Sequence, residues 1–82
     1  MIPSKRGPKV RVYGNGSVIV DGIEFGRVEQ GEGVAYWYPP EGQVASSHHS
    51  ERPDRLEAVS PRDLRDKVLW QWLNPDAAAA SW

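Results

Sequence analysis

The chain has 82 residues, a formal net charge of −1 and no cysteine. This length predicts one domain with a small core, and the lack of cysteine excludes disulfide bonds, thiol catalysis and zinc–thiolate sites. No apolar run approaches the roughly 18 residues of a membrane span, and no apolar stretch follows the early basic residues as in a signal peptide, so we expect a soluble cytoplasmic protein.

The N-terminal segment Met1–Pro8 combines prolines and a glycine with the basic residues Lys5 and Arg6. This composition predicts a flexible, extended basic arm outside the folded domain. The alternative is an arm that contacts the phosphates of a nucleic acid.

Residues 9–38 are predicted to form a meander of antiparallel strands. Turn residues separate short runs rich in valine and aromatic residues. Asp21-Gly22 predicts a two-residue hairpin, because both positions of a type I′ turn need a positive φ. The expected strands are Lys9–Tyr13, Ser17–Val20, Ile23–Glu29 and Val34–Tyr38.

The expected loop lengths fix which residues pair and therefore which face each side chain occupies. They pair Val12 with Val18, Val20 with Ile23, Phe25 with Tyr38, and Arg27 with Tyr36. One face then collects the core residues Val10, Val12, Val18, Val20, Ile23, Phe25, Tyr36 and Tyr38. The opposite face carries a smaller patch that includes Arg11, Tyr13, Ile19 and Trp37.

Residues 41–59 show no clear period, and we expect a mobile loop there. Gln43–Ala45 could form a short strand and Pro53–Leu56 a helical turn. The C-terminal tail, residues 75–82, is alanine-rich but too short for an isolated helix. We expect a frayed tail, or alternatively docking of Trp82 on the sheet or on a second copy of the chain.

The segment Ser60–Asn74 is predicted to form the main helix. Ser60 is a favourable N-cap, and Asn74-Pro75 ends the helix because proline disfavours helical geometry in the residue before it. Apolar residues fall on one side at helical spacing, and this stripe should pack on the core face of the sheet. Its members are Leu64, Val68, Leu69, Trp72 and Leu73; Trp70 points away from it.

No motif for catalysis or for cofactor binding stands out. His48 and His49 are adjacent, so on an extended segment they point opposite ways and chelate one metal poorly. The glycines at 14–16 and 31–33 are followed by strands rather than by a helix, which is typical of hairpin turns and not of phosphate-binding loops. We therefore expect a protein without enzymatic activity, metal, cofactor or small-molecule substrate.

In its order of elements, the segment 9–74 resembles the arm-type DNA-binding domains of phage integrases, in which a sheet backed by one C-terminal helix reads a groove. The resemblance implies nucleic-acid contacts from Lys5, Arg6, Lys9 and Arg11, with Tyr13, Ile19 and Trp37 on the same face. Four glutamates, Glu24, Glu29, Glu32 and Glu41, lie near that face or its loops. Arginine outnumbers lysine seven to three, which is typical of GC-rich genomes and favours a phage or mobile-element origin.

The sequence thus predicts an α+β domain, a small antiparallel meander of three to four strands packed on one face by a single C-terminal helix. Aromatic residues outside the expected core favour a protein-interaction or regulatory module. The partner would be another protein or a second copy of the chain, and nucleic-acid binding is the alternative. The expected contact residues are Arg11, Tyr13, Ile19 and Trp37, with Trp70 as a second surface.

Overall fold

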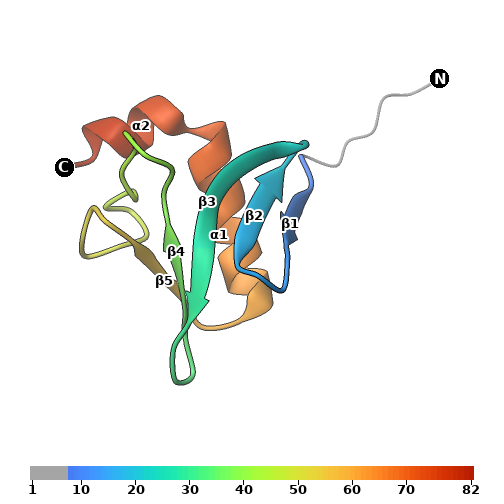
Figure 1. Cartoon of the computed structure of the whole chain (residues 1–82). Helices are drawn as coiled ribbons and strands as arrows, with labels where there is room; N and C mark the ends of the chain where they lie inside the picture. Colours follow the sequence, from blue (N-terminus) through green and yellow to red (C-terminus); the bar gives the residue numbers. More distant parts are fainter. Residues whose placement is uncertain (1–7) are drawn as a thin grey trace.

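The computed structural model describes residues 8–82 and contains one antiparallel sheet with strand order β1-β2-β3-β4-β5. Helix α1 crosses one face of this sheet, and the short helix α2 follows it (Figure 1). The α+β class is confirmed, with five strands rather than three to four. The elements are β1 Val10–Val12, β2 Ser17–Val20, β3 Ile23–Gln30, β4 Ala35–Tyr38, β5 Leu56–Ala58, α1 Pro61–Leu73 and α2 Pro75–Ala80.

The first hairpin and the part of the second hairpin nearest its turn have the predicted register. Val12 pairs with Val18 on β2, and Val20 pairs with Ile23 on β3. Asp21 and Gly22 both have positive φ, 51° and 79°, as a type I′ turn requires. The local turn chemistry therefore determines this part of the sheet.

A β-bulge in β3 changes the faces from that point onward. Ile19 pairs with Glu24 but Ser17 pairs with Arg27, so two residues, Phe25 and Gly26, lie opposite one. Gly26 has a φ of 81°, and a Cβ there would lie 2.3 Å from the carbonyl oxygen of Tyr38. Only glycine fits this position, and the extra residue exchanges the side chains that face inward.

The β3–β4 pairing also differs from the prediction, because the turn consists of residues 31–34 rather than of residues 30–33. Arg27 pairs with Tyr38 rather than with Tyr36, and Val28 pairs with Trp37. After the bulge, Val28 and Trp37 face α1, whereas the tyrosines of β4 lie on the opposite face. The expected placement of Tyr36 and Tyr38 in the core was therefore wrong.

Trp37 is the centre of the core and not a surface residue. Its exposed fraction is 0%, its Nε1 donates to the carbonyl oxygen of Phe25 at 2.9 Å, and the two rings lie 5.2 Å apart. The prediction that Trp37 lies on the face away from the helix is thus wrong, because it assumed an unbulged β3.

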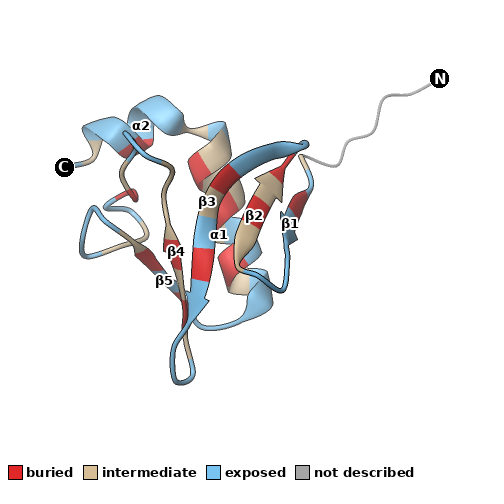
Figure 2. Ribbon diagram, in the orientation of Figure 1, coloured by how far each residue is buried: buried red, intermediate tan, exposed pale blue. Residues whose placement is uncertain are grey.

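Helix α1 covers the inward face of the sheet (Figure 2). It begins as predicted, with the Ser60 hydroxyl accepting from the N–H of Asp63 at 3.0 Å. Leu64 and Val68 are buried, and Trp72 meets Phe25 edge-on at 5.1 Å. Leu73, expected in the stripe, is 57% exposed.

The segment between β4 and β5 is held against α1 by hydrogen bonds. Gln71, buried on α1, accepts from the N–H of Ser46 at 2.9 Å and donates to the carbonyl oxygen of Val44 at 2.7 Å. Residues 43–45 form no strand, and residues 56–58 form β5 where we expected the end of a helical turn.

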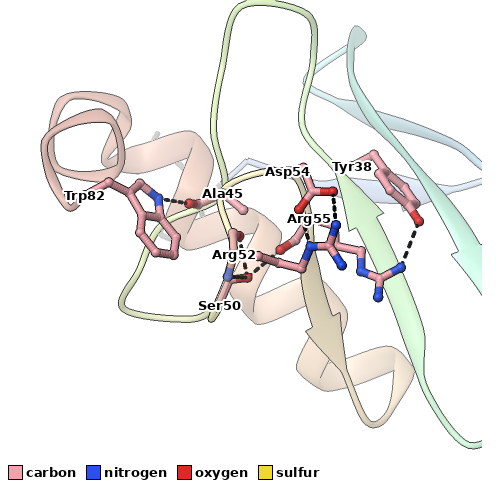
Figure 3. Close-up of polar contacts among 7 residues, drawn as sticks. All are labelled: Tyr38, Ala45, Ser50, Arg52, Asp54, Arg55 and Trp82. Atoms are coloured by element: carbon pink, nitrogen blue, oxygen red, sulfur yellow. Dashed lines mark hydrogen bonds and ion pairs between the residues drawn. The ribbon is translucent and has the colours of Figure 1, made fainter.

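The C-terminal residues fold back on the same segment. Trp82 Nε1 donates to the carbonyl oxygen of Ala45 at 2.6 Å, and Ser81 Oγ accepts from the N–H of Ser47 at 2.9 Å. Figure 3 shows the Trp82 contact beside the Arg52–Asp54 ion pair. Trp82 therefore docks on the loop, whereas the alternatives considered from the sequence were the sheet or a second copy.

Candidate functional site

An open groove lies between β1 and the first turns of α1. Its volume is about 510 Å³, and the β3–β4 turn and the β5–α1 junction close its other sides. Two apolar side chains on its walls are well exposed, Val12 at 46% and Val59 at 74%. The apolar lining consists chiefly of Val10, Val12, Val34, Val59, Pro61 and Leu64.

The edge of β1 beside this groove has backbone groups that pair with no strand among residues 8–82. Tyr13 N–H donates to the carbonyl oxygen of Ser17 at 2.9 Å, and the carbonyl oxygen of Lys9 accepts from Asp21 at 3.4 Å. In an antiparallel ladder, alternate residues point their N–H and C=O groups to the same neighbour. Val10 and Val12 therefore direct theirs away from β2, and no other described strand pairs with β1.

The groove and the edge together form the candidate site. Val10 and Val12 offer outward backbone groups, and their side chains line the groove. A strand added at this edge would place every second side chain on the groove side. This combination is the one recognised in strand-addition sites, where hydrogen bonds hold the backbone and pockets select the side chains.

The sheet face turned away from α1 carries most of the residues predicted from the sequence. Arg11 and Tyr13 are exposed and Ile19 is half-buried, whereas Trp37 is absent from this face. Tyr36 and Tyr38 take its place, a pair that the sequence reading had assigned to the core; a glycine inside a strand was the signal for the bulge that moved them.

Charges of both signs alternate on this outward face. The Arg55 guanidinium lies 4.0 Å from the centre of the Tyr36 ring and donates to the Tyr38 hydroxyl at 3.3 Å. Glutamates are interleaved with the arginines across the strands. The charged residues on this face include Arg11, Glu24, Arg27, Glu29, Arg55 and Glu57.

Trp70, the predicted second surface, is half-buried rather than free. The rings of His48 and His49 meet it edge-on at 5.4 and 4.9 Å. Burial lowers the pKa of His49, and the nearby Lys67 and His48 lower it further, while Asp63 opposes them. His48 and His49 therefore cover one side of this tryptophan.

A polar hollow beside these histidines has basic groups that are already paired. Lys67 Nζ lies 3.0 Å from a carboxylate oxygen of Asp63 and donates to the carbonyl oxygen of Glu57 at 2.8 Å. Arg52 pairs with Asp54. Within residues 8–82, no group of three histidine, cysteine or acidic side chains could hold a metal ion.

Three further points concern the predicted arm residues and the chain as a whole. Lys5 and Arg6, predicted as nucleic-acid contacts, lie outside the described residues. Neither helix in the described part of the chain is long and apolar enough to cross a bilayer. Comparison of the chain with protein-family models, curated proteins and solved structures gave no match.

Proposed function

We propose that this protein is a small, non-enzymatic protein-binding module that holds an extended segment of a partner by strand addition to β1. The observation that carries the proposal is the apolar groove of about 510 Å³ beside a sheet edge with outward backbone groups. The groove contributes apolar burial, and the edge contributes directional hydrogen bonds.

The proposal places the binding energy in two kinds of contact. Val10 and Val12 each provide one N–H and one C=O group, so a bound segment can form up to four backbone hydrogen bonds. Its groove-facing side chains would cover Val12 and Val59, whose exposure otherwise leaves apolar surface in water. Burial of such surface contributes about 25 cal/mol per Å² before the costs of association.

Nucleic-acid binding by the outward face stays a prediction. Its residues Lys9 and Arg11 are exposed, but Glu24, Glu29 and Glu57 lie on the same face. Phosphate binding is favoured by a face of one sign, so this arrangement gives the alternative no specific support.

The edge of β1 can be blocked without removing a hydrogen bond of the sheet. In Val12→Pro the lost N–H is the outward one, and proline is tolerated at an edge strand in that orientation. Val59→Asp makes the groove wall polar. Leu73→Asp is the matched control, because Leu73 is also an exposed apolar residue but does not line the groove.

In the test, a fluorescein-labelled nine-residue peptide that alternates valine and threonine is titrated with each protein. Fluorescence anisotropy measures the affinity, and amide NMR shifts of the protein locate the binding site. We expect binding by the parent and the Leu73→Asp control, with shifts at Val10, Val12 and Leu64. Val12→Pro and Val59→Asp should each weaken it about tenfold, equivalent to about 1.4 kcal/mol. No saturation at about 1 mM peptide, or equal binding by all four proteins, would contradict the proposal.

A further inference from the structure

We infer that the segment bound at β1 carries an acidic side chain opposite Arg11, flanked on both sides by apolar side chains that enter the groove. This inference rests on the proposed function and specifies the chemistry of the partner. It predicts a local acidic–apolar alternation, with acids on the outward face of the added strand.

The hydrogen-bond pattern of β1 fixes which side chains of the partner meet which residues. Val10 and Val12 direct their backbone groups to the added strand, so Arg11 occupies the non-hydrogen-bonded position between them. In an antiparallel pair, residues opposite at such a position have Cα atoms only about 4.5 Å apart. A side chain placed there meets Arg11 directly.

The charge of Arg11 has no partner among the described residues. The residue that pairs with Arg11 on β2 is the apolar Ile19. Arg11 is in neither of the ion pairs found in residues 8–82. Arg65, on the groove wall, is likewise in neither of these pairs. Arg11 therefore favours a carboxylate opposite it in the added strand, whereas Arg65 lies on the groove side and does not face the outward position.

Other charges near the site limit this preference to the outward position opposite Arg11. Glu32 lies on the turn between Gly31 and Gly33, two residues that line the groove. A carboxylate directed into the groove would approach both Glu32 and Arg65, whose opposite charges offset each other, and would lose contact with the apolar lining. The groove-facing positions therefore favour apolar side chains.

The same geometry disfavours a second copy of this chain in the register that is centred on Arg11. A symmetric β1–β1 pair centred on residue 11 would place Arg11 against Arg11 of the other copy. Like charges directly opposite on neighbouring strands are destabilising. A partner with an acidic residue opposite Arg11 would be attracted at the position where a second copy in that register would be repelled.

The test compares three labelled nine-residue peptides that alternate valine with glutamate, threonine or lysine. The parent protein should bind the glutamate peptide about two- to fivefold more tightly than the threonine peptide, and the lysine peptide most weakly. The order of the charged peptides should reverse in Arg11→Glu. Arg62→Glu is the matched control, because Arg62 is exposed, carries the same charge and does not line the groove.

The outcomes separate this inference from the proposed function. Equal affinity for all three peptides, with binding still lost in Val12→Pro, would overturn the acidic preference and leave strand addition standing. An equal change in Arg11→Glu and Arg62→Glu would also overturn it, since net charge alone would then explain the result. Failure of all three peptides to bind would count against the proposed function itself.

Discussion

The two sides of helix α1 differ in how their neighbouring backbone groups are hydrogen-bonded. On the side of the segment 39–55, Gln71 bonds to the backbone of Val44 and Ser46, and Trp82 bonds to that of Ala45. On the side of β1, the helix borders a groove, and the strand beyond it has backbone groups that no other described strand pairs.

This difference distinguishes a surface that stabilises the fold from a surface that remains available for a partner under the proposed function. A buried backbone group without a partner costs free energy, so a loop packed against a helix requires polar side chains at matching positions. Gln71 and Ser81 meet that requirement for the segment 39–55. No described side chain does so for the edge of β1, which is why we propose that side as the binding surface.

The largest expected effect comes from removing the hydrogen bonds that Gln71 makes to the segment 39–55. Gln71→Leu would leave the N–H of Ser46 and the carbonyl oxygen of Val44 without their partner in a buried site. We expect a loss of about 2–4 kcal/mol in the free energy of unfolding, since each buried unsatisfied group costs about 1–3 kcal/mol. Urea denaturation measures it, and Gln43→Leu, at an exposed position, is the control.

Equal stability of Gln71→Leu and the parent would contradict the proposed difference between the two sides of α1. The two sides of α1 would then be energetically alike, and hydrogen bonds to the loop would not explain its order. Peptide binding at the groove should persist in any fraction of Gln71→Leu that remains folded.

A smaller effect is expected at the C-terminus. Trp82→Phe retains a large apolar ring but removes the Nε1 donor to the carbonyl oxygen of Ala45. We expect a loss of about 1 kcal/mol, the typical net contribution of one hydrogen bond. Amide hydrogen exchange at residues 43–47 should quicken while exchange in β1–β3 is unchanged. Uniform acceleration across the domain would show that the tail stabilises more than its own side.

The smallest effect concerns pH. Burial lowers the pKa of His49, so the unfolded chain binds a proton more readily than the folded one. The resulting stability is present above the ordinary histidine pKa of about 6.5 and is lost as the pH falls below it, through the lowered pKa. Urea midpoints of the parent and His49→Gln should differ in their pH dependence only below about pH 6.5.

A constant difference between the parent and His49→Gln across the pH range would mean that titration of His49 does not contribute. His48 faces the same tryptophan, so His48→Gln serves as the matched control. Peptide affinity at the groove should not follow this titration, since neither histidine lines the groove.

Local rules predicted the parts of the fold that depend on neighbours in sequence. The Asp21-Gly22 turn set the pairing of Val20 with Ile23, and Ser60 capped α1 as expected. The order of the first four strands and of helix α1 followed from these short-range signals, whereas β5 and α2 were not predicted. The class of the fold was therefore predictable without any long-range contact.

The candidate site was only partly predictable, because it depends on a single inserted residue and on distant contacts. Gly26 shifts the faces of β3 and β4, which buried Trp37 and removed it from the expected surface. A glycine within a strand pattern indicates a bulge, and this signal was present. Gln71 lies between Val68 and Trp72 in the sequence. No sequence pattern predicted its hydrogen bonds to the backbone of Ser46 and Val44, which are 25 and 27 positions away. The groove depends on how α1 lies over β1, which no local pattern specifies.

The glycine at position 26 also makes the chain unusually sensitive to length at one point. Shortening β3 by that one residue would turn the downstream half of the sheet inside out, with the tyrosines of β4 beneath α1 and its tryptophan in water. Natural or engineered variants should therefore accept changes of length at the Gly14–Gly16 turn far more readily than between Phe25 and Val28.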